Sequence, residues 1–101
     1  MSAEDPILTI SVAANILGVH PRTLMLYEKA GLISPHRTST KRRMFSLKNL
    51  EELQFIKYLL REKGVNLMGA RLLLETMTIA EKEGIRLKKV LFPNFKTKKL
   101  V

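Results

Sequence analysis

The chain has 101 residues, of which 46% are hydrophobic and 27% charged, as expected for one small globular domain. It contains no cysteine, which excludes a disulfide framework, a thiolate metal site and a cysteine nucleophile. No apolar run approaches the roughly 18 residues that span a membrane, and the acidic start MSAEDP is not typical of a signal peptide.

The net charge of +9 is unevenly distributed along the chain. Residues 7–50 contain seven basic side chains and a single acid, Glu28, whereas residues 51–84 are nearly neutral. Residues 85–101 contain six basic side chains and no acid. A surface adapted only for solubility would mix the two signs. Two positive blocks therefore indicate a polyanionic partner, most simply nucleic acid.

The first predicted elements are a short strand and a short helix. The β-branched stretch Ile7 to Ile10 favours a strand. Ser11 can cap a helix that runs from Val12 to about Leu17. Gly18 then ends this helix, because glycine adopts the left-handed conformation without a steric penalty.

A second helix is predicted almost immediately afterwards. It starts at Pro21, whose fixed φ suits the first turn of a helix, and continues to about Ala30, before Gly31. Two short helices joined by so tight a turn must cross at a steep angle. This pattern predicts a helix-turn-helix.

The next segment predicts a wing, residues 36–45. No apolar side chain occurs between Pro35 and Met44, and Met44 and Phe45 form a short returning strand. The tip of this loop would carry three consecutive basic residues, namely Lys41, Arg42 and Arg43. Because like charges repel one another, a phosphate backbone explains this cluster better than solvation does.

Three further segments complete the expected architecture. Ser46 caps a helix from Leu47 to about Lys63, and Asn66 caps one from Leu67 to about Glu83. A short helix over residues 85–91 precedes an extended, mobile tail. The expected fold is therefore mainly α: a winged helix-turn-helix with a two- or three-stranded wing sheet and two further helices.

The sequence contains no pattern of residues that is typical of a catalytic site. His20 and His36 lie in predicted turns without a nearby carboxylate, and Asp5 is the only aspartate. There is no phosphate-binding loop and no nucleophile motif. We therefore expect no enzyme activity, no metal and no cofactor.

The candidate DNA contacts lie in the second helix and the wing. The first turns of such a helix meet base edges and phosphates. Arg22 is favoured because a basic residue in the first turn opposes the helix dipole unless an anion is present. Tyr27 is equally compatible with a phosphate contact and with partial burial. The full candidate set is Ser11, His20, Arg22, Thr23, Met25, Tyr27, Lys29, Arg37, Lys41, Arg42 and Arg43.

From Leu8 to Glu75 the sequence resembles the MerR family of winged helix-turn-helix regulators. The resemblance rests on RTLMLYEKAGLI, on RTSTKRRMFS and on LEELQFIKYLLREKG. GVNLMGA and the ISVAA stretch are similar to the HspR branch of heat-shock repressors. The resemblance implies a cytoplasmic repressor that binds an inverted-repeat operator as a dimer, with Arg22, Tyr27, Arg42 and Arg43 against DNA. It divides the chain into an extension (1–7), a DNA-binding domain (8–76) and a C-terminal segment (77–101).

Two departures from the family pattern concern DNA binding and dimerisation. Met25 stands where the family has an arginine, which removes an expected phosphate contact. The family dimerises through a long coiled coil, whereas residues 77–91 provide too few heptads for one. A shorter homodimer contact through 77–91 and a monomer are both compatible with the sequence.

The last segment, KKVLFPNFKTKK, has two readings. It is similar to peptides bound by DnaK-type chaperones, and the resemblance implies such a chaperone as co-repressor. The apolar anchors would be Val90, Leu91, Phe92 and Phe95. Equally, the segment could be a basic tail that adds non-specific DNA affinity. An alternative for the whole chain is a modulator that binds chaperones and keeps the MerR-like fold without using it on DNA.

Overall fold

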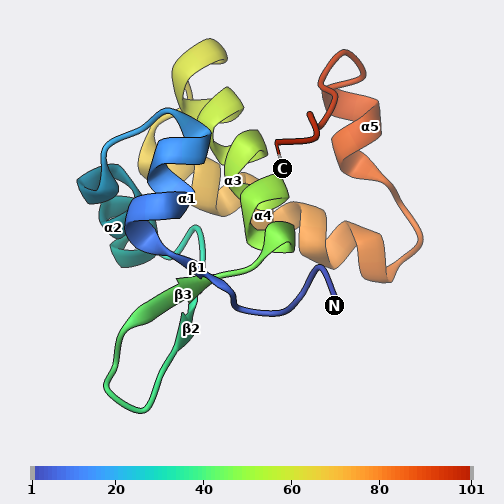
Figure 1. Cartoon of the computed structure of the whole chain (residues 1–101). Helices are drawn as coiled ribbons and strands as arrows, with labels where there is room; N and C mark the ends of the chain where they lie inside the picture. The colour runs from blue at the N-terminus through green and yellow to red at the C-terminus, as the bar shows by residue number, and fades with distance from the viewer. Residues whose placement is uncertain (1, 101) are drawn as a thin grey trace.

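A computed structural model describes residues 2–100 and confirms the mainly helical winged helix-turn-helix (Figure 1). Among these residues, no helix combines the length and the apolar character needed to cross a bilayer. In chain order the elements are β1 (Leu8–Thr9), α1 (Ile10–Leu17), α2 (Pro21–Lys29), β2 (His36–Arg37), β3 (Arg43–Phe45), α3 (Leu47–Lys57), the π-helical turn η1 (Tyr58–Glu62), α4 (Leu67–Lys82) and α5 (Leu87–Leu91).

A three-stranded antiparallel sheet connects the wing to the helices. Its strand order is β1-β3-β2, with Leu8 opposite Phe45 and His36 opposite Met44. The β-ribbon of β2 and β3 projects from the body of the molecule (Figure 1). The central strand β3 therefore links the wing directly to the start of α3.

The start of α1 differs from the prediction. Thr9, not Ser11, is the N-cap, and its Oγ1 accepts a hydrogen bond of 3.3 Å from the backbone N–H of Val12. The strand occupies only two residues, so the helix begins at Ile10 and Ser11 lies exposed in its first turn. The predicted end is confirmed, because Gly18 adopts φ 70°.

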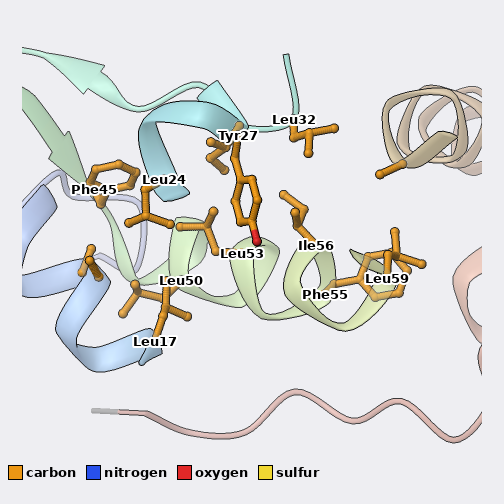
Figure 2. Packing of buried hydrophobic residues seen from close by; sticks show 14 residues of the cluster. Leu17, Leu24, Tyr27, Leu32, Phe45, Leu50, Leu53, Phe55, Ile56 and Leu59 are labelled. Carbon is orange, nitrogen blue, oxygen red and sulfur yellow. The ribbon is translucent and has the colours of Figure 1, made fainter. Parts of the chain in front are cut away.

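Helix α3 lies at the centre of the core (Figure 2). Its start agrees with the prediction: Ser46 Oγ accepts from the N–H of Asn49, and Asn49 Oδ1 accepts from the N–H of Ser46, both at 3.0 Å. The largest fully buried side chains, which exclude water from this core, are Phe45, Leu24, Leu53, Ile56 and Leu59.

The end of this helix was only partly predicted. Residues 58–62 form a π-helical turn, in which Lys63 N–H donates to Tyr58 O, before Gly64 at φ 68°. One extra residue in a single turn hardly changes the spacing of apolar side chains, so periodicity cannot distinguish it from α-helix. Helix α4 agrees with the prediction, since the Asn66 side chain accepts from Gly69 N–H at 2.7 Å.

The tail was expected to be extended and mobile, and the structure places it against α3. Residues 92–100, here called the strap, form a turn at 93–94, where Phe95 N–H donates to Phe92 O, and cross α3 without further regular structure. Phe95 packs on Tyr58 and Phe55, with ring centroids 4.8 and 5.2 Å apart. Gln54 Nε2 donates to Lys98 O at 2.7 Å, and Lys98 N–H donates to Gln54 Oε1 at 2.8 Å. Aromatic packing and paired hydrogen bonds therefore hold the strap in place.

Candidate nucleic-acid interface

The first turn of α2 is organised by His20. This residue is the N-cap, and its Nδ1 accepts a hydrogen bond of 3.1 Å from the backbone N–H of Arg22. Pro21 occupies the first helical position, where its missing N–H removes no helical hydrogen bond. His20, a predicted contact residue, thus has a structural role as the cap of α2. The side chain of Arg22 remains exposed at the start of the helix.

Helix α2 divides into a buried and an exposed face. Leu24 and Tyr27 point into the core and are 1% and 4% exposed. The opposite face carries Arg22, Met25, Leu26 and Lys29, all exposed, and Thr23 is half-buried beside it. Met25 and Leu26 retain 40% and 48% of their accessible surface. Two exposed apolar side chains therefore lie between two cations on one helical face.

Tyr27 belongs to the core, which favours the burial of this residue over the phosphate contact that the resemblance implied. Its ring lies between α2 and α3 (Figure 2). Burial raises the pKa of the Tyr27 hydroxyl, and the nearby Arg61 guanidinium offsets part of this effect. Arg61, on the last turn of the α3–η1 helix, is therefore the polar neighbour of this hydroxyl.

The tip of the wing, residues 38–42, is a hydrogen-bonded turn. Lys41 N–H donates to Thr38 O at 2.8 Å, and Arg42 N–H donates to Thr38 Oγ1 at 3.0 Å. Lys41 has φ +63°, the left-handed region that non-glycine residues seldom adopt. Both Lys41 and Arg42 are exposed. The tip thus presents two cations on an ordered turn.

Arg43 is not at the tip, contrary to the prediction, but in strand β3. There it forms an ion pair with Glu28 of α2, with Arg43 Nε 2.5 Å from Oε1. Arg37 of β2 joins the same carboxylate, with Nη2 2.9 Å from Oε2, and its Nη1 donates to Lys41 O. Glu28 therefore links α2 to both strands of the wing through ion pairs.

The environment of Glu28 favours its charged form. Burial alone would raise the pKa of the Glu28 carboxyl, but the hydrogen bonds and charges of Arg43 and Arg37 outweigh it. The pKa of Glu28 therefore lies below its ordinary value. Arg37 and Arg43 are paired with this carboxylate, whereas Lys41 and Arg42 form no ion pair within residues 2–100.

Helix α2 and the wing lie on the same side of the molecule (Figure 1). A helix with cations and methyl-bearing side chains can contact base edges and thymine methyl groups, and a basic loop beside it can contact phosphates. Sequence reasoning missed Leu26 and Glu28. Leu26 lies one helical turn from Arg22, and Glu28 is the only acid between residues 7 and 50, so both signals were present.

Comparison with known proteins agrees with this architecture. Residues 8–77 match the family described as MerR HTH family regulatory protein. The chain is 37% identical over 75 residues, 74% of its length, to the putative heat shock protein HspR of Streptomyces coelicolor. It is 33% identical over 66 residues, 65% of its length, to the HTH-type transcriptional regulator GlnR of Bacillus anthracis and to that of Bacillus cereus. Each alignment spans 50% of the relative, so the chain covers about half the length of these proteins.

Proposed function

The chain belongs to the MerR family of helix-turn-helix regulatory proteins, and from this premise we propose that it regulates transcription by binding operator DNA. The proposed role is repression of heat-shock or chaperone genes, in keeping with the name of the relative from Streptomyces coelicolor. In this proposal α2 enters the major groove and the wing contacts the flanking phosphates. The proposed place of action is the bacterial cytoplasm, on chromosomal DNA.

The exposed face of α2 carries this proposal. Arg22 and Lys29 supply positive charge, and Met25 and Leu26 supply exposed methyl and methylene groups between them. Exposure of these two apolar side chains to water is unfavourable, whereas contact with thymine methyl groups in a DNA groove would bury both of them. Met25, which replaces the family arginine, therefore fits an apolar base contact.

Fluorescence anisotropy with two duplexes tests the proposal. One duplex carries the promoter of a chaperone operon, and the other is a shuffled sequence of the same composition. We expect the promoter to bind roughly 10³-fold more tightly or better. Arg22→Ala should reduce this ratio by about 5- to 150-fold, because a bidentate base contact contributes about 1–3 kcal/mol.

The contributions of the wing and of α2 to DNA affinity can be distinguished by the dependence of that affinity on salt concentration. Lys41→Ala/Arg42→Ala should weaken binding to both duplexes alike and lower the slope of log K against log salt by about 2. Lys89→Ala, on α5, is the control for a general loss of charge. Equal affinity of the natural chain for the promoter and the shuffled duplex would contradict operator recognition.

The proposed operator is an inverted repeat, which two copies of the chain would occupy together. Residues 77–91 offer exposed apolar side chains for contact between copies. Ile79, Val90 and Leu91 are 66%, 69% and 48% exposed. Light scattering of the complex measures the stoichiometry, and we expect two chains on each inverted repeat. One chain on each duplex would contradict this part of the proposal.

A DnaK-type chaperone is the second proposed partner. Val90 and Leu91 are exposed, whereas Phe92 and Phe95 are half-buried against Phe55 and Tyr58. A chaperone that grips all four anchors must therefore first displace the strap. We expect a peptide of residues 88–99 to bind DnaK more tightly than the full chain does, as measured by anisotropy. A peptide that does not bind would contradict the chaperone proposal.

A further inference from the structure

A second basic region surrounds a cavity of about 680 Å³ between the strap, the end of α1 and the surface of the α3–η1 helix. This volume falls within the range of sites that hold small ligands. The cavity is lined by four cations and one carboxylate, namely Lys57, Arg61, Lys96, Lys98 and Glu62. The aromatic side chains of Tyr58 and Phe95 line the same space.

The cations of this cavity are poorly compensated. Within residues 2–100, the ion pairs involve Arg37, Arg43, Lys48 and Arg71, none of which lines it. Lys57 Nζ donates to Leu17 O at 2.8 Å, the end of α1, and Arg61 lies beside the Tyr27 hydroxyl. Docking of the strap therefore brings its two lysines, Lys96 and Lys98, towards the cations of the α3–η1 helix. Because like charges repel, an anion in the cavity would favour the docked strap.

The cavity lies away from the candidate DNA interface. In Figure 1 the strap and α2 lie on opposite sides of α3, and Figure 2 shows the same separation from a second direction. A duplex that is held by α2 and the wing would therefore lie on the other side of the molecule. The position favours a small anion as the ligand of the cavity.

We propose that this cavity binds a small molecule that carries at least two phosphates, such as a nucleoside diphosphate or triphosphate, and that the bound anion stabilises the docked strap. Lys96 and Lys98 supply point charges for one phosphate, and Arg61, whose guanidinium also lies beside the Tyr27 hydroxyl, has N–H groups left for the next. Tyr58 and Phe95 pack on each other and are both half-buried, so the part of their rings that lines the cavity is the surface available to a base. The ligand would thereby control how often Phe92 and Phe95 are exposed.

Isothermal titration calorimetry with pyrophosphate and with ATP, at constant ionic strength, tests the site on the full chain. We compare Lys96→Gln/Lys98→Gln with Lys41→Gln/Arg42→Gln, which removes the same charge from the wing. The strap variant should bind both probes about 10-fold more weakly or worse, because the loss of even one of the two charge-assisted contacts costs about that factor. The wing variant should bind them within about 2-fold of the natural chain.

Arg61→Gln provides a second variant on the helix itself and should weaken both probes by a similar factor. Hydrogen exchange of the Lys98 amide, which donates to Gln54, reports on the strap. Pyrophosphate should slow this exchange in the natural chain and leave it unchanged in the strap variant. Tighter binding of ATP than of pyrophosphate is expected from base stacking.

Several outcomes would overturn the proposal. Absence of binding would show that the cavity holds no phosphate ligand. Equal weakening in the strap and wing variants would show that the chain attracts phosphates only through its net charge. ATP that binds no more tightly than pyrophosphate would contradict the nucleotide assignment. Displacement of pyrophosphate by a duplex, in the wing variant as well, would assign the cavity to DNA. The operator assay with Arg22→Ala is independent of all these results.

Discussion

Glu28 joins α2 to both strands of the wing, so its replacement should loosen the whole interface. Its carboxylate accepts hydrogen bonds from Arg37, at 2.9 and 3.1 Å, and from Arg43, at 2.5 Å. Because Arg37 is partly exposed and therefore screened, we expect Glu28→Gln to lower the free energy of unfolding by about 1–2 kcal/mol. Urea denaturation at neutral pH measures this difference.

The same substitution has a predictable pH dependence. The pKa of Glu28 is lowered from 4.5 in the folded chain, so its ion pairs stabilise the fold above about pH 4.5. This contribution is lost as the pH falls through the lower folded pKa. The stability difference between the natural chain and Glu28→Gln should therefore shrink as the pH falls from about 5 through the folded pKa. A difference that stays constant over this range would contradict the assigned ion pairs.

Lys41 combines a strained backbone with an exposed charge. A substitution at this position should therefore affect the free energy of unfolding and the affinity for DNA in different directions. Its φ of +63° suits glycine. We expect Lys41→Gly to leave the free energy of unfolding unchanged or to raise it by up to about 1 kcal/mol. The salt slope of DNA binding should fall by about 1. Arg42→Gly removes the same charge without relief of strain, and it should destabilise the chain; equal stability of the two variants would contradict the argument.

Residue roles could be predicted from the sequence only where they depend on near neighbours. Glu28 is conspicuous as a lone acid, but its partners lie 9 and 15 residues away across the wing, so their pairing requires the folded ribbon. Tyr27 was ambiguous for a similar reason. Helical spacing places it beside Leu24, yet only the position of α3 shows that this face is buried.

Helix α2 depends on an unusual cap, which predicts the effect of substitutions at His20. Its Nδ1 satisfies the N–H of Arg22, which would otherwise lack a partner within the helix. His20→Ala should lower the free energy of unfolding by about 1 kcal/mol, whereas His20→Asn should preserve most of it, because asparagine is among the best N-caps. Thermal unfolding of both variants checks this. Equal losses in the two variants would show that His20 acts otherwise than as a cap.

Helix boundaries were predictable wherever a short-range signal marks them. Gly18, Ser46 and Asn66 end or cap helices as expected, because each of these effects acts within four residues. The predicted start of α1 was two residues too late, because Thr9 and Ser11 are both good N-caps and only the short length of β1 selects Thr9. The π-turn η1 has no comparable sequence signal.

The arrangement of the whole molecule was predictable except for its last residues. The helix-turn-helix and wing follow from local patterns, whereas the strap depends on contacts between residues 44 positions apart, Gln54 and Lys98. A run of lysines with interspersed aromatic residues suits a free tail as well as a docked one. Only the packing of Phe95 on the rings of Phe55 and Tyr58 in the folded chain shows where the tail lies.

Docking of the strap can be tested through its most central ring. Phe95 contacts Phe55 and Tyr58, and Lys88 Nζ lies 5.1 Å from its centroid. Removal of the ring in Phe95→Ala should lower the local free energy of opening by more than about 1.4 kcal/mol, which corresponds to a tenfold larger open population. Trypsin should therefore cleave after Lys96 and Lys98 about 10-fold faster or more.

Val90→Ala is the matched control for this prediction, because it also shortens an apolar side chain near the strap. Val90 is 69% exposed, and its truncation should leave the cleavage rate unchanged. If the natural chain is already cleaved as fast as Phe95→Ala, the strap is open in solution. A chaperone would then have direct access to Phe92 and Phe95, and an anion in the cavity would have to supply the whole free energy of docking.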